Sequence, residues 1–120
     1  MTDRMTDLAR PMPRPTAQVA PFVEVLGPDL TVAFLIRFGG AELYLAAAPG
    51  GRSALEAPVG HDKAKALAAY PDMQMIQRIP LARKWLVQMM AWQGQPNAHI
   101  ARTVRVATST VRRYLNTVAT

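Results

Sequence analysis

The sequence contains no cysteine, few aromatic residues and no long apolar run. Without cysteine, disulfide bonds, thiolate catalysis and cysteine-based zinc sites are excluded. The longest apolar stretch, residues 31–38, includes Arg37 and is far shorter than the roughly 20 residues that span a bilayer. The first ten residues carry four charged side chains instead of the apolar run of a signal peptide. We therefore expect a cytoplasmic protein with no membrane partner.

Groups that catalyse reactions are also sparse. His61 and His99 are the only histidines, and the one neighbouring carboxylate, on Asp62, is adjacent to His61 and therefore points away from it. No cluster has the spacing of metal ligands, no glycine pair has the pattern of a phosphate-binding loop, and no serine lies beside a base. The sequence predicts that the protein is not an enzyme and needs no metal or cofactor.

The acidic residues are unevenly distributed. Residues 73–120 hold seven Lys or Arg and no Asp or Glu, a charge of +7, whereas residues 1–72 hold seven basic and eight acidic residues, a charge of −1; together these give the net charge of +6. Such an imbalance indicates a polyanionic partner for one half and a different task for the other. Double-stranded DNA is favoured over a membrane surface, because the basic residues do not line one face opposite a broad apolar face.

The acid-free half ends in a pattern typical of a helix-turn-helix, over residues 97–116. Ile100 and Val104 lie four residues apart and share one face of a first helix, and apolar residues from Val111 onward repeat at intervals of three and four in a second. Ala101 suits the point where two steeply crossed helices come closest, because a larger side chain would push them apart. A plain helical hairpin with solvated arginines is the weaker alternative.

Two positions depart from this pattern. Arg105 stands in the turn where many helix-turn-helix segments have glycine, and a positive φ there would cost an arginine on the order of 1 kcal/mol or more. Ala107 occupies the place of the usual hydroxyl cap, so we expect Thr108 to start the second helix one residue later. A hydroxyl of Thr108 or Ser109 can cap this helix.

The outward side chains of both helices suit DNA. Ser and Thr can reach phosphates or base edges, Arg can fork onto guanine, and Asn can pair with adenine. The predicted DNA-binding residues are His99, Arg102, Arg105, Thr108, Ser109, Arg112, Arg113 and Asn116.

The chain as a whole divides into three predicted regions. Residues 1–18, with three prolines, read as a flexible or polyproline-like arm, residues 19–79 as a dimerisation region, and residues 80–120 as a three-helix DNA-binding domain. The predicted fold class is mainly α with one or two short strands.

Local signals place the elements of these regions. Pro28 or Asp29 is expected to open a helix, and Pro71 to end a short one that begins at His61. We expect one or two helical turns over 19–26, a loop over 47–58, a weakly marked strand over 73–79 and a helix over 81–93 that Gly94 ends. The last helix would pack Trp85 and Trp92 into the core of the DNA-binding domain.

The segment from residue 29 to 46 has two interpretations. It reads as a hairpin on a two-glycine turn, or as an apolar helix ended by Gly39 in a left-handed cap and followed by one strand. We favour the helix, because its large apolar side chains recur every four residues. A helix that is apolar nearly all round needs cover on most sides, and in a short chain a second copy is the natural cover. The predicted dimer interface consists of Leu30, Phe34, Phe38, Leu43, Tyr44 and Leu45.

The order of these features resembles the Mor transcription-activator family of phage and prophage regulators, over about residues 22–117. The residues that carry the resemblance are Val25–Gly27, Leu30 and Phe34–Leu45, which include the Phe-Gly-Gly and the Tyr of the family pattern, followed by the helix-turn-helix. Leu45-Ala46 replaces the family's Ile-Pro. The resemblance implies a homodimer paired about a two-fold axis, two helix-turn-helix units on an inverted repeat beside a promoter, and activation through RNA polymerase.

The leading hypothesis is thus a homodimeric, sequence-specific DNA-binding transcription regulator, of the activator type that the resemblance implies. A DNA-packaging or recombination accessory protein, such as a small terminase-like subunit, is the first alternative. A module in which the helix-turn-helix binds another protein is the second. The oligomeric state distinguishes the first alternative from the leading hypothesis, because a packaging subunit would form high-order oligomers and a regulator a dimer. Substitution of Arg112 and Arg113 distinguishes the second, because DNA binding should collapse only if the helix-turn-helix binds DNA.

Overall fold

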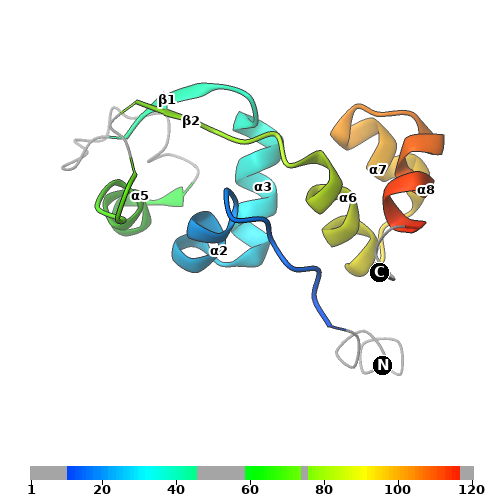
Figure 1. Ribbon diagram of the computed structural model, residues 1–120, viewed down its shortest axis with the longest axis horizontal. Coiled ribbons are helices and arrows are strands. Elements are labelled where there is room, and N and C mark those ends of the chain that lie inside the picture. Colours follow the sequence, from blue (N-terminus) through cyan, green and yellow to red (C-terminus); the bar gives the residue numbers. More distant parts are fainter. Residues whose placement is uncertain (1–10, 46–58, 74–75, 117–120) are drawn as a thin grey trace. The chain divides into compact units, whose positions relative to one another are not determined.

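The computed structural model describes residues 11–45, 59–73 and 76–116 (Figure 1). Over these residues the protein has six helices and one two-stranded sheet, which confirms the predicted class, mainly α with short strands. The chain divides into two compact units, one of residues 15–82 and one of residues 83–120 together with 1–14. No helix in the described part of the chain is both long and apolar enough to cross a membrane.

The unit of residues 15–82 begins with two helices, α2 (Ala20–Leu26) and α3 (Pro28–Phe38). Gly27, at φ +84°, separates them, and Pro28 opens α3 as expected. The two helices pack through their aromatic residues, since Phe22 stacks on Phe34 with ring centroids 5.5 Å apart. Phe38 adds a third ring, 5.2 Å from that of Phe34. This aromatic cluster is the centre of the unit's core.

The ambiguous segment is a helix followed by a strand, β1 (Glu42–Tyr44), so the favoured interpretation is confirmed and the hairpin is wrong. The predicted left-handed cap at Gly39 is also wrong: Gly39 has φ −53° and ψ 130°, and Gly40 has φ +85°. Gly39 and Gly40 instead form a type II turn, closed by the N–H of Ala41 on the carbonyl of Phe38 at 2.9 Å, and the N–H of Gly40 bonds to the carbonyl of Ile79 at 2.7 Å.

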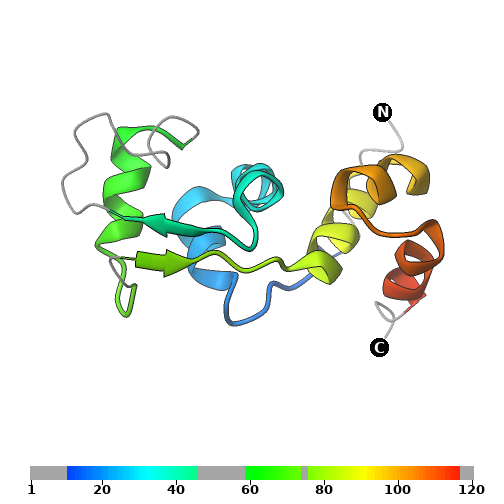
Figure 2. The same ribbon diagram turned by 90° about the horizontal axis from the view of Figure 1, so that it is seen from above.

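Strand β1 pairs with β2 (Ile76–Arg78) in antiparallel register, with Glu42 opposite Arg78 (Figure 2). The two strands are not joined by a tight turn, because helix α5 (His61–Ala68) lies between them in the chain. The predicted loop over 47–58 lies outside the described residues.

Helix α5 contacts α2, and a hydrogen bond between Tyr70, just after α5, and Glu24 of α2 links the same two segments. The hydroxyl of Tyr70 donates a 2.5 Å hydrogen bond to Glu24 Oε2. This bond to the carboxylate favours the protonated phenol and raises the pKa of Tyr70 above its usual value.

The second unit contains three helices, α6 (Arg83–Trp92), α7 (Asn97–Val104) and α8 (Thr108–Asn116), and each contacts the other two. Helix α6 begins two residues later than predicted, because Ala82 has a positive φ of 51° and cannot continue a helix. The core of this three-helix unit comes mainly from α6 and α7. The buried side chains are Trp85, Leu86, Val87, Met89, Met90, Ile100, Ala101, Val104 and Val111.

Candidate nucleic-acid interface

The predicted helix-turn-helix segment folds as α7, a three-residue connection over 105–107, and α8 (Figure 1). Four apolar residues of the pattern, Ile100, Ala101, Val104 and Val111, are buried, whereas Val106, Tyr114 and Leu115 are half-buried. The eight predicted DNA-binding side chains share the opposite property, since every one of them is exposed: His99, Arg102, Arg105, Thr108, Ser109, Arg112, Arg113 and Asn116. The two helices therefore combine a buried seam with a polar outer surface.

Arg105 adopts the left-handed conformation that its position in the turn predicts, with φ 64° and ψ 51°. The N–H of the next residue, Val106, reaches back to the carbonyl of Ala101 at 3.0 Å. The end of α6 has the same bond, from Gln95 to Met90 at 3.0 Å, around Gly94 at φ +91°. Both helices thus end in a Schellman motif, but only α7 does so with a side chain, that of Arg105, at the left-handed residue.

Helix α8 begins at Thr108, and the capping prediction needs correction. The N–H of Val111 bonds to the carbonyl of Ala107 at 3.1 Å, so Ala107 supplies the first carbonyl of the helix and occupies the N-cap position. Thr108 and Ser109 are the first and second residues of the helix. Their exposed hydroxyls are consequently part of the outward surface of the first turn.

The outward residues of α8 form one stripe along the helix. Ser109, Arg112, Arg113 and Asn116 are separated by three, one and three residues, a spacing that keeps them on one face. Nine residues at about 1.5 Å each make α8 about 13 Å long, which is close to the roughly 12 Å width of the DNA major groove.

The electrostatics of this surface are of one sign. The four arginines of α7, the connection and α8 are exposed, and residues 11–14 and 83–116 contain no Asp or Glu. No carboxylate in the described part of this unit can therefore neutralise them. The guanidinium of Arg113 lies 5.6 Å from the ring centroid of Tyr114, which restrains its position. Exposed arginines without a neutralising carboxylate in the described part of the unit attract phosphate.

The residues predicted as a dimer interface lie in the other unit and differ in exposure. Phe34 and Leu45 are 1% and 3% exposed, so their apolar surface is already covered within their own chain. Leu30, Phe38 and Leu43 are half-buried, and the side chain of Tyr44 lies outside the described part. Three large apolar residues that the sequence prediction did not assign to the interface are between 41% and 61% exposed: Ile36, Ile76 and Leu81.

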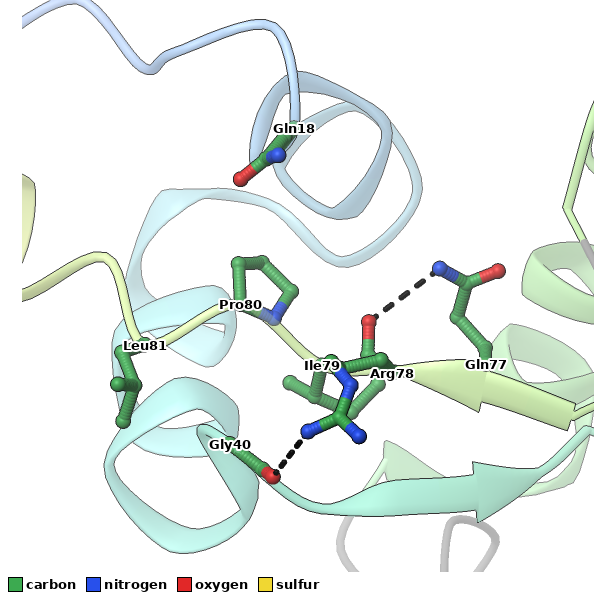
Figure 3. A pocket seen from close by; sticks show the side chains of 7 residues that line it. All are labelled: Gln18, Gly40, Gln77, Arg78, Ile79, Pro80 and Leu81. Carbon is green, nitrogen blue, oxygen red and sulfur yellow. Dashed lines mark hydrogen bonds between the residues drawn. The ribbon is translucent and has the colours of Figure 1, made fainter.

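The same unit has a pocket of about 420 Å³ beside the sheet (Figure 3). Its one charged lining residue, Arg78, donates to the carbonyl of Gly40 at 3.4 Å and pairs with Glu42 at 3.5 Å. The guanidinium charge is thus already engaged by groups of the chain. Among the described residues no three His, Asp or Glu side chains are grouped as metal ligands would be. The pocket therefore offers no catalytic constellation.

One contact on the three-helix unit has no counterpart in the sequence pattern. The indole Nε1 of Trp85 donates to the carbonyl of Pro13 at 3.2 Å, across 72 residues of chain. It holds part of the predicted flexible arm, residues 1–18, against α6; residues 1–10 of that arm lie outside the described part. No periodicity or motif pairs two such distant segments, so only the folded structure could reveal the contact.

No protein-family model matches this chain, and no curated protein and no solved structure matches it.

Proposed function

We propose that the protein is a sequence-specific transcription regulator that binds double-stranded DNA through a helix-turn-helix made by α7 and α8. One observation carries the proposal: all eight side chains expected to meet DNA are exposed, on two helices and a connection that bury Ile100, Ala101, Val104 and Val111 and whose unit has no acidic residue in its described part. A plain helical hairpin requires the buried seam, but it does not require four exposed arginines without a neighbouring carboxylate.

In this proposal α8 is the recognition helix and enters the major groove. Arg112 and Arg113 pair with guanine, and Asn116 pairs with adenine. Arg102 and Arg105 lie on α7 and the connection, where phosphate is the nearer partner. His99, in the first turn of α7, and the hydroxyls of α8 complete the polar surface. The backbone contacts hold the orientation, and the base contacts provide the specificity.

The active species in this proposal is a homodimer. A single nine-residue helix reads few bases, whereas two linked half-sites raise the affinity by orders of magnitude. The unit of residues 15–82 carries the exposed Ile36 and Ile76, which offer apolar surface for association. The order of features that resembles the Mor family supports an activator beside a promoter, with RNA polymerase as a further partner.

The decisive experiment combines site selection with substitution. Selection of bound duplexes from a random pool should yield a repeated half-site, and R112A and R113A should each weaken binding to it by about 1–3 kcal/mol, or roughly 5- to 150-fold. R37A is the matched control, because Arg37 is an exposed arginine on α3, in the other unit, and its removal changes the net charge equally.

Each alternative has its own outcome. Failure of the wild-type protein to shift any duplex at low salt would overturn the proposal. Unchanged binding in R112A and R113A would show that α8 is not the recognition helix and would favour the protein-interaction module. The molar mass from light scattering distinguishes a regulator from a packaging protein, because the regulator should be a dimer and the packaging protein a ring of many copies.

A further inference from the structure

We propose that Arg14 forms, together with Arg83 and Lys84, a second DNA contact on the three-helix unit, directed at backbone phosphates. This inference rests on the proposed function and extends it to residues that the helix-turn-helix pattern does not include. It starts from the hydrogen bond of Trp85 Nε1 to the Pro13 carbonyl at 3.2 Å. This bond places Arg14, the next residue, at the start of α6.

The anchor is well defined on both sides. Trp85 is only 2% exposed, and a buried indole N–H needs an acceptor, which the Pro13 carbonyl supplies. Pro11, Pro13 and Pro15 have restricted φ angles, which lowers the entropy lost when this segment is held in one conformation. Arg14 is therefore held beside the helix rather than at the end of an unrestrained tail.

Three positively charged residues flank this hydrogen bond along the chain. Arg14 follows the anchored residue, Arg83 and Lys84 open α6 immediately before Trp85, and all three are exposed. Lys and Arg in a first helical turn oppose the helix dipole, so the stability of α6 does not explain Arg83 and Lys84. A phosphate at this position would interact favourably with all three cations and with the dipole.

The arrangement matches a known mode of DNA binding. In homeodomains an arm preceding the first helix contacts the duplex beside the groove that the recognition helix occupies. Here the comparable position, at the start of the first of three helices, is filled by a segment 70 residues earlier in the chain. The chemistry of Arg and Lys at this place is that of phosphate contacts, which do not depend on the base sequence.

The test measures how binding of the full-length protein depends on salt. Loss of one phosphate contact lowers the slope of log K against log salt by about 0.9, so R14A should lower it by about 0.9 per protomer. R14A should weaken binding to the selected site and to unrelated duplexes by the same factor. R14K keeps the charge and should keep the slope, and R37A, on α3, serves as the control.

A second variant tests the anchor itself. W85F keeps an aromatic ring in the core but removes the indole donor, so it should lower the slope in the same direction as R14A, with circular dichroism reporting that the helices persist. If R14A has the wild-type slope while R112A weakens binding, only this inference is overturned. If the wild-type protein binds no duplex, the proposed function is overturned as well.

Discussion

Arg105 provides the sharpest test of the connection between α7 and α8. It holds φ 64° and ψ 51°, a left-handed conformation that disfavours any residue with a Cβ by about 1–2 kcal/mol. Its side chain is exposed, so its removal leaves no cavity. We therefore compare R105G, which relieves the backbone, with R105A, which removes the same charge but keeps the Cβ.

The expected difference follows from two opposing terms. Glycine regains most of the 1–2 kcal/mol of left-handed strain, but its unfolded chain is more flexible, which offsets about 0.4–1 kcal/mol. R105G should thus be more stable than R105A by about 0.5–1 kcal/mol, or roughly 2–8 °C in Tm for a domain of this size. R102G is the matched control, because Arg102 lies inside α7, where glycine should instead destabilise by about 1 kcal/mol.

Urea unfolding followed by tryptophan fluorescence is the suitable assay. Both tryptophans, Trp85 and Trp92, lie on α6, so the signal reports on the three-helix unit. R105G and R105A should lose the same amount of DNA affinity, because both remove one cation. A stability of R105G equal to or below that of R105A would refute the claim that this turn is under backbone strain.

Two further predictions concern the other unit. The raised pKa of Tyr70, caused by its bond to Glu24, means that the folded state holds the phenol proton more tightly; the resulting stability is present below pH 10 and is lost as the pH rises through the folded pKa. Urea midpoints at pH 8 and pH 11 should accordingly differ more in the wild type than in Y70F, and an equal difference would contradict this reading. G39A should destabilise the unit by about 1–3 kcal/mol, because a Cβ at Gly39 would lie 2.7 Å from the carbonyl oxygen of Leu35. G27A meets nothing within 4 Å and isolates the cost of a positive φ alone; a thermal melt of G39A identical to that of the wild type would disprove the close contact.

Local rules account for what the sequence predicts well. The spacing of Ile100, Val104 and Val111 marks the buried sides of α7 and α8. Which side of a helix a residue occupies depends only on its position along that helix. The left-handed Arg105 was also predictable, because it stands where the turn of many helix-turn-helix segments has a glycine. The exposure of the eight predicted DNA-binding residues follows from the same periodicity.

Errors arose where a neighbour distant in sequence decided the outcome. Gly39 is not left-handed, because it lies in a turn whose next residue, Gly40, bonds to Ile79, and no signal near the turn indicates that distant partner. The stacking of Phe22 from α2 on Phe34 is likewise a contact that no local pattern indicates.

The sequence by itself determined the helical class, the acid-free half of the chain and the face of α8 that carries arginine, because these depend on composition and on the 3.6-residue period. Only the tertiary structure decided which apolar residues are internal, that β1 pairs with β2 on either side of α5 in the chain, and that Pro13 reaches Trp85. Those outcomes depend on contacts between residues up to 72 positions apart, and many alternative pairings satisfy the same local preferences. Packing and hydrogen bonding in the folded chain select one of them.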